Sequence, residues 1–280
     1  MPRLPLLRPT SLRLALVAGL LAAATASPAG AQTRRWDFGD RTAPGACTQS
    51  AAGSTVGTAT GIENVFTCTE QPGSPIATLR LTAFNAGTAA TSVFATGAVT
   101  PQGTTNGVGV GSRAERGLAS GSGNGEHALD NNGTGGADAL LLHFLNGPEA
   151  ITRVTIGWSG TDADFQLLRW TGAAAPTLAG STVSGALAAG WQLVAAVNGA
   201  ANIGEPDAHY AVNGGRVASS HWLLSAYNPA LGALPGFTAD ATADRFKVRG
   251  VTVTTPEPST YALMAAGVAA LAAAARRRRA

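Results

Sequence analysis

Hydrophobic residues in the central part of the chain, residues 32–254, follow the two-residue period of β-strands. In residues 77–83, alanine and leucine alternate with threonine and arginine, which predicts a half-buried strand. Residues 153–158 alternate in the same way. Three apolar runs that are typical of buried strands lie at 140–145, 191–197 and 221–227. Since no long stretch repeats with the period of a helix, we expect a β protein.

The last predicted strand, Asp244–Thr254, changes its hydrophobic phase halfway along. Phe246 and Val248 occupy one phase, whereas two later valines occupy the other. Because side chains alternate between the faces of a strand, the two pairs would point to opposite faces unless one residue were added. Gly250 lies at the break, so we expect a β-bulge there that returns all four side chains to one face.

About ten short segments of this kind, separated by glycine, asparagine, proline and threonine, predict an all-β fold. The chain has 36 glycines and only 12% charged residues, a composition that suits many turns. We therefore expect an antiparallel β-sandwich, jelly-roll-like, over residues 32–254. Residues 100–125 are expected to form a loop, and residues 172–190 a weak helix or a long connection.

The chain begins with a pattern typical of a secretory signal peptide, residues 1–31. Arginines at positions 3, 8 and 13 precede an 11-residue apolar run, Leu14–Ala24, and residues 29–31 supply the small side chains that signal peptidase recognises. The run is too short to cross a bilayer core of roughly 30 Å. We therefore expect export across the inner membrane and removal of this segment by signal peptidase.

The other end of the chain, residues 255–280, has the opposite order. Its three parts are Pro256, Glu257 and Pro258, an apolar run over residues 261–275, and four arginines at positions 276–279. As a helix, residues 259–275 would be about 26 Å long and would just reach across a bilayer. The arginines should stay cytoplasmic, and the prolines keep the preceding segment extended and accessible to a processing enzyme.

This order of motif, apolar run and arginines resembles the PEP-CTERM sorting domain of Gram-negative bacteria. The resemblance implies recognition by exosortase, an integral-membrane protease or transpeptidase that removes the tail, and a product at the cell surface or outside the cell. Until then, the single transmembrane sorting helix would hold the chain in the membrane. A plain membrane anchor is the alternative, whereas a tail that binds nucleic acid is disfavoured by the apolar run.

The central part resembles a family of exosortase-dependent surface proteins through the order of seven short blocks. The blocks are GVGV (107–110), EHALDNNG (126–133), ADALLLHF (137–144), VTIGW (154–158), DADFQLLRW (162–170), SSHWLLSAYN (219–228) and DRFKVRGV (244–251). That family implies no established catalytic activity. The resemblances together imply a non-enzymatic protein with a structural or adhesive role, linked to an extracellular polysaccharide matrix.

Positive charge is concentrated at the two ends of the chain. The formal net charge is +3, but residues 32–275 hold 12 basic and 16 acidic groups, a net charge of −4. A mildly acidic domain is a poor partner for nucleic acid or for anionic membrane surfaces.

The chain has two cysteines, Cys47 and Cys68. In an oxidising compartment we expect them to form one disulfide, which closes a 22-residue segment. Loop entropy gives such a closure a stabilisation of about 3 kcal/mol. With no histidine nearby in the sequence, the pair is a poor zinc site.

Residues 130–138, DNNGTGGAD, offer oxygen atoms of the kind that calcium prefers. Asp130, Asn132 and Asp138 are the candidate ligands. The segment is not an EF-hand, because Leu141 stands where a bidentate glutamate is required. Either these residues bind calcium at the edge of the sandwich, or they form an Asx-rich turn between strands. We favour the turn, and no other cofactor is expected.

Asp162 and Asp164 form an Asp-x-Asp pattern before a strand, which places both carboxylates on one face. They suit calcium binding or acid–base catalysis, or they are solvated residues at a strand entry. A hydrolase would add a histidine such as His127, but the four histidines are scattered and no HExxH or GxSxG motif occurs. We therefore expect no enzyme.

The tryptophans at positions 158, 170, 191 and 222 leave a further alternative open. Their strand contexts predict packing in the core. Exposed on a sheet face, they would instead suit stacking on sugars in a carbohydrate-binding module.

Overall fold

A computed structural model describes residues 33–39, 47–49, 63–68, 77–101, 103–111, 128–131, 136–204, 206–255, 267–268 and 271. The chain divides into a compact unit, Thr33–Pro256, and a second unit of the terminal segments Met1–Gln32 and Glu257–Ala280. The predicted signal peptide and almost all of the predicted sorting helix lie outside the described residues. In the part that is described, no helix is long and apolar enough to cross a membrane.

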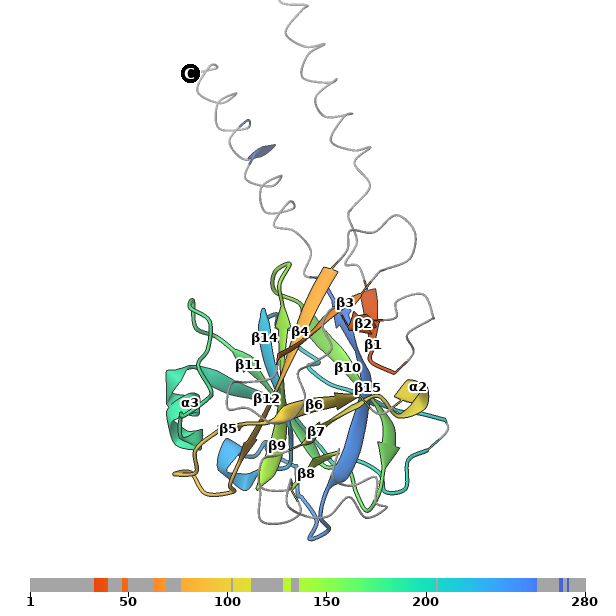
Figure 1. Ribbon diagram of the computed structural model, residues 1–280. Helices are drawn as coiled ribbons and strands as arrows, with labels where there is room; N and C mark the ends of the chain where they lie inside the picture. The colour runs from red at the N-terminus through yellow and green to blue at the C-terminus, as the bar shows by residue number, and fades with distance from the viewer. Residues whose placement is uncertain are drawn as a thin grey trace, which may run out of the picture. The chain divides into compact units, whose positions relative to one another are not determined.

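The compact unit consists mostly of β-strands (Figure 1). The strands are β1 (Thr33–Asp37), β2 (Cys47–Gln49), β3 (Glu63–Cys68), β4 (Ala77–Ala86), β5 (Ala95–Thr96), β6 (Ala98–Pro101), β7 (Val108–Gly111), β8 (Leu129–Asp130), β9 (Ala137–Phe144), β10 (Ala150–Ser159), β11 (Phe165–Trp170), β12 (Trp191–Val197), β13 (Ala208–Ala211), β14 (His221–Ala226) and β15 (Arg245–Thr254). The helical segments are α2 (Gly103–Asn106), α3 (Val183–Ala189) and the 3-10 turn η2 (Pro229–Leu231).

The strands form two antiparallel sheets. In the first sheet the order is β13-β10-β15-β7-β6, and β1 and β8 also pair with β15. The second sheet has the order β12-β11-β14-β9-β4-β3-β2, with β5 beside β4. The predicted all-β class and antiparallel pairing are thus confirmed, while the jelly-roll order stays a prediction.

Strand β15 organises the first sheet. It pairs with β10 along one edge, and along the other edge with β8, β7 and β1 in turn. Thr155 of β10 pairs with Gly250, and the next residue, Ile156, pairs with Val248, so Arg249 is one extra residue in β15. This bulge confirms the predicted change of phase. Phe246, Val248 and the two later valines all lie in one buried cluster.

The close approach of β1 requires glycine at position 250. A Cβ atom there would lie 2.0 Å from the carbonyl oxygen of Trp36 in β1, far inside van der Waals contact. The bulged Arg249 also holds β1, because its Nε donates to Asp37 Oδ1 over 2.8 Å and its NH1 donates to the carbonyl oxygen of Thr105.

The two sheets pack against each other over one hydrophobic core. Aromatic rings from both sheets meet there, with the ring centroids of Phe165 and Phe246 6.1 Å apart and those of Trp36 and Phe144 5.8 Å apart. Burying apolar area of this kind is the main favourable term in folding.

A second core covers the other face of the second sheet. Leu168 and Leu223 of that sheet pack there with Val183 of α3 and with Leu178 and Leu231 of the connecting segments. Helix α3 lies beside β12 in Figure 1, and its N-terminus is capped by the Thr182 hydroxyl. Since β14 is covered on both sides, all six of its residues are buried, which explains its continuous apolar run.

One predicted loop is only partly a loop. Within residues 100–125 the structure has the end of β6, helix α2 and strand β7, while residues 112–127 lie outside the described part. Val108 and Val110 of β7 are fully buried in the core. The prediction was wrong for β7 because glycines between the valines weaken the local strand signal, whereas packing against β15 supplies the stabilisation.

The register of β2 and β3 bears on the predicted disulfide. Cys47 and Cys68 are directly opposed partners at one end of this antiparallel pair. Opposed residues have Cα atoms roughly 4.5–5.5 Å apart, a span that a disulfide bridges without strain. The side chains of both strands lie outside the described residues, so the bond itself stays a prediction.

We predict that protein recovered after export is two hydrogen atoms lighter than after reduction, and that its cysteines resist alkylation until reductant is added. Loss of the cross-link in Cys47→Ser should lower the free energy of unfolding by about 3 kcal/mol. Mass spectrometry and denaturant unfolding measure these effects. Free thiols in the untreated protein, or equal stability of oxidised protein and variant, would contradict the prediction.

Candidate functional site

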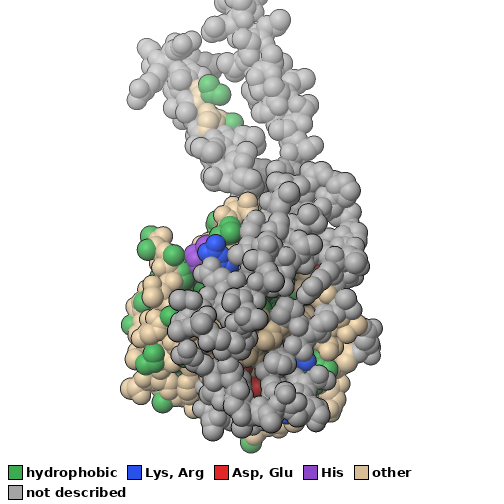
Figure 2. Space-filling model, in the orientation of Figure 1, with side chains coloured by type: hydrophobic (Ala, Val, Ile, Leu, Met, Phe, Trp, Pro, Cys, Tyr) green, Lys and Arg blue, Asp and Glu red, His purple; other side chains and the backbone are tan. Residues whose placement is uncertain are grey.

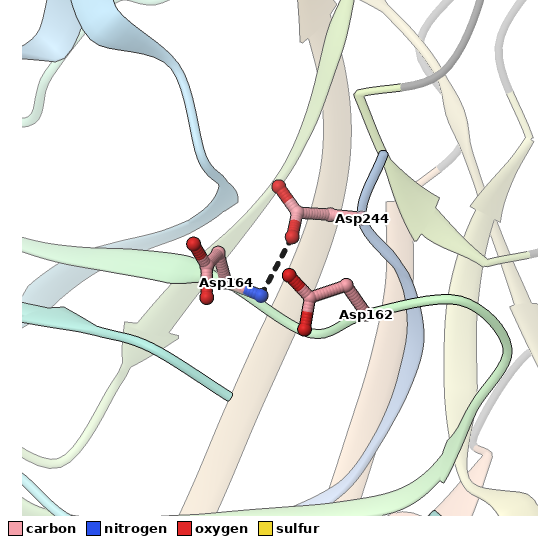
Figure 3. Close-up of side chains that lie close together, drawn as sticks. All are labelled: Asp162, Asp164 and Asp244. Carbon is pink, nitrogen blue, oxygen red and sulfur yellow. Dashed lines mark hydrogen bonds between the residues drawn. The ribbon is translucent and has the colours of Figure 1, made fainter. Parts of the chain in front are cut away.

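Three buried aspartates meet at one end of the two sheets. Carboxylate oxygens of Asp162, Asp164 and Asp244 all lie within 4.8 Å of one another (Figure 3). Their side chains are only 4%, 2% and 1% exposed. Buried carboxylates are rare unless something compensates their charge, so this group is the first candidate for a functional site.

Two segments far apart in the sequence bring these residues together. Asp162 and Asp164 lie in the turn between β10 and β11, and Asp244 directly precedes β15. The Arg245 N–H donates to the carbonyl oxygen of Asp162 over 3.0 Å, and the Gly160 N–H donates to the carbonyl oxygen of Arg245 over 2.8 Å. This exchange of backbone hydrogen bonds extends the β10–β15 pairing into the turn.

Hydrogen bonds from neighbouring groups hold two of the carboxylates. Asp244 Oδ1 accepts from the Asp164 N–H over 2.7 Å, and Asp164 Oδ1 accepts from the Gly199 N–H over 3.0 Å. The Asn131 side-chain amide donates to Asp244 Oδ2, and its oxygen accepts from the Asp244 N–H. Asn131 therefore ties the end of β8 to the start of β15.

The electrostatics of the cluster follow from its burial. Burial raises the pKa of Asp164 to about 6 and that of Asp244 to about 8, against backbone N–H groups that lower both. Burial also raises the pKa of Asp162. Asp240, which is exposed, interacts with the Asp162 side chain, and the Thr242 N–H that donates to Asp240 lowers the pKa of that carboxyl.

The donor set is chemically uniform. In the part of the chain that the structure describes, no histidine or cysteine joins the three aspartates. Hard cations such as calcium prefer oxygen ligands, whereas zinc favours nitrogen and sulfur. The residues present therefore fit a hard divalent cation.

Asp130 and Asp138, two of the candidate ligands at 130–138, do not join this cluster. Asp138 Oδ2 lies 3.4 Å from the Asp130 N–H, which donates to it, and both side chains are buried. Asn132 lies outside the described residues. The sequence pattern thus identified Asp162 and Asp164 but missed Asp244. The sequence feature that could have identified Asp244 is its position directly before the bulged strand β15.

The described histidines form no catalytic arrangement with the aspartates. His143 and His221 are partners on β9 and β14, and their rings stack with centroids 3.9 Å apart. Arg80 of β4 is the cross-strand partner of His143. Figure 2 shows histidine and basic side chains side by side on a face whose other described residues are mostly uncharged. His209 contacts Thr155, and His127 lies outside the described residues.

A shallow hollow lies next to the aspartates. It has a volume of about 510 Å³ and is lined by Ala196, Asn198, Leu234, Pro235, Gly236, Phe237 and Thr238. Asn198 directly precedes Gly199, which donates to Asp164. The ring of Phe237 contacts that of Tyr227, at 5.4 Å between centroids, and the Tyr227 N–H donates to the carbonyl oxygen of Asp164.

The tryptophans mostly pack in the core. Trp36, Trp191 and Trp222 are buried, which agrees with core packing, while Trp158 and Trp170 are half-buried. A sugar-binding row of exposed tryptophans is therefore not formed by these five side chains.

These features define a β-rich domain of two antiparallel sheets with a buried carboxylate cluster. Residues 254–279 match the model of the PEP-CTERM protein-sorting motif, so the chain carries this sorting motif behind its β domain. The motif implies export, processing by exosortase, and a cell-surface or extracellular location. No curated protein matches the chain, and no solved structure does.

The histidine pair predicts a pH dependence. Burial, and then the neighbouring His143, lowers the pKa of His221 from 6.5 to about 4. Between these values the unfolded chain binds more protons, so the free energy of unfolding should fall as pH drops from 6.5 to 4 and level off below. In His221→Phe this part of the loss should disappear, since the ring remains but cannot be protonated.

Melting curves from pH 7 to 4 would measure the effect, with the exposed His209→Phe as control. The raised pKa values of Asp164 and Asp244 act in the opposite direction, because their contribution to stability is lost as pH rises. They are present in all three proteins, so the difference between proteins isolates His221. Parallel pH profiles for wild type and His221→Phe would refute the prediction.

Proposed function

We propose that this protein is a non-enzymatic component of the cell surface or extracellular matrix, with a structural or adhesive role. The observation that carries the proposal is the sorting motif at residues 254–279, directly behind a compact β domain. Strand β15 ends at Thr254, the first residue of the matched motif, so its ladder with β10 and β1 is complete before Pro256. Cleavage behind this point would leave the domain's sheets intact.

The geometry of the carboxylates supports a non-enzymatic role. Catalytic acids and bases must reach a substrate within hydrogen-bond distance. The three aspartates are almost fully buried, and two of them are already engaged by backbone N–H groups. Carboxylates buried in this way are poorly placed for turnover of a substrate. The proposed association with extracellular polysaccharide comes from the sorting motif.

The hollow beside the aspartates favours a second candidate, a carbohydrate-binding module. It combines an aromatic ring, Phe237, with the polar side chains of Asn198 and Thr238. An aromatic face for stacking and a few polar groups for hydrogen bonds are what a sugar site requires. Its volume lies within the range of small-ligand sites, roughly 300–1,000 Å³.

Processing by exosortase predicts a shortened protein. In cells with exosortase, the mature chain should end before the arginines at 276–279, whereas cells without the enzyme should keep them. Joint replacement of Pro256, Glu257 and Pro258 by alanine should give the uncleaved form even when exosortase is present. Gly204→Ala, in open space, is the matched control. Mass spectrometry of the protein decides, and a tail reaching Arg279 in every strain would refute the proposal.

For the second candidate, a glycan array should show binding that Phe237→Ala weakens by about tenfold, as expected when stacking worth roughly 1.4 kcal/mol is lost. The control is Val93→Ala, an exposed apolar side chain outside the hollow. The array is run with and without chelator. If no glycan binds in either arm, the carbohydrate-binding role is excluded.

A further inference from the structure

The aspartate cluster holds more negative charge than its neighbours compensate. Among the described residues, no arginine or lysine forms an ion pair with Asp162, Asp164 or Asp244. Three carboxylates that are buried and close together cannot all stay ionised unless a positive charge lies between them. Either protons or a cation must neutralise the group.

One oxygen in the cluster receives no hydrogen bond from the described residues. This oxygen is Asp162 Oδ2, which is buried in a residue that is only 4% exposed. Asp164 interacts with the backbone N–H groups of Gly199 and Asp240, and Asp244 with those of Asp164 and Tyr227 and with the Asn131 amide, whereas a carboxylate has about four acceptor sites. All three carboxylates therefore keep lone pairs free, and Figure 3 shows the carboxyl groups gathered in one place.

We propose that Asp162, Asp164 and Asp244 bind one calcium ion, with the exposed Asp240 completing the site from the solvent side. This inference is independent of the proposed surface role. It uses other residues than the sequence-based candidate at Asp130–Asp138, and it adds Asp244 and Asp240 to the calcium alternative that the sequence left open for Asp162 and Asp164. The ion supplies the positive charge that the protein lacks and a ligand for the unpartnered oxygen of Asp162.

The chemistry of the cluster favours calcium over other divalent cations. All the donors are oxygen atoms, which disfavours zinc. Magnesium requires near-ideal octahedral geometry at about 2.0–2.1 Å, which carboxylates already held by hydrogen bonds from the protein are poorly placed to provide. Calcium accepts six to eight oxygen ligands at about 2.3–2.6 Å in flexible geometry. Asp162 and Asp164, with Asp240 at the rim and a few waters, are compatible with such a set around Asp244.

Calcium bound here would join three parts of the fold. Asp162 and Asp164 belong to the β10–β11 turn, Asp244 leads into β15, and Asn131 links Asp244 to β8. The ion would thus connect the two sheets at this end of the domain. Calcium-binding modules that act outside the cell commonly have dissociation constants of about 10⁻⁴–10⁻³ M. In a calcium-poor compartment the same carboxylates would weaken the domain.

The test compares protein purified from the exporting cells with three variants. Asp162→Asn removes a negative charge from the cluster and breaks no hydrogen bond at Oδ2, so this variant should fold. Asp207→Asn is a control outside the cluster. Asp138→Asn tests the candidate site at Asp130–Asp138. Isothermal titration with calcium chloride should give one site per chain. The Asp162→Asn change should weaken it about tenfold or more, and the other two should not.

Melting curves give a second readout. After chelation, calcium at about a hundred times its dissociation constant should raise the midpoint by roughly 5–10 °C in wild type, and magnesium should have a much smaller effect. Asp162→Asn should melt at or above wild type in chelator but respond less to calcium. The proposal is overturned if calcium neither binds nor stabilises, if magnesium acts equally, or if Asp138→Asn rather than Asp162→Asn abolishes binding.

Discussion

The first sheet depends on the pairing of β15 along both of its edges. This strand meets β10 on one side and β8, β7 and β1 on the other, so segments from the beginning, middle and end of the domain share its backbone hydrogen bonds. The bulge at Arg249 lets it face one core along its whole length, and Gly250 lets β1 approach. Without the extra residue, half of its apolar side chains would leave the core. The sorting motif begins where this strand ends.

The central strands of the second sheet, β9, β11 and β14, are largely buried on both faces. One face packs against the first sheet, and the other is covered by α3 and its flanking segments. Strands covered on both sides read as apolar runs and leave little room for a ligand on the covered faces. The aspartates lie in the segments that lead into β11 and β15, and the hollow lies beside β12, away from these covered faces.

The aspartate cluster connects the location of the protein with its physical chemistry. A domain sorted to the cell surface meets calcium at concentrations that the cytoplasm does not offer, and weak oxygen-ligand sites are filled there. Like charges that destabilise the protein without a cation become ligands when one is present. Such a site would make the fold most stable after export, without any catalytic step.

Local patterns in the sequence predicted the all-β class and the bulge near Gly250. They also predicted the pairing of the two cysteines, which the register of β2 and β3 places opposite each other. They also determined the sorting motif, because its order of residues is itself the signal. Tertiary structure alone decided that Asp244 joins Asp162 and Asp164 across about 80 residues, that β7 enters the core, and that α3 covers the second sheet. Alternation of side chains is a property of neighbouring residues, whereas the meeting of distant carboxylates depends on which strands pair and in which register.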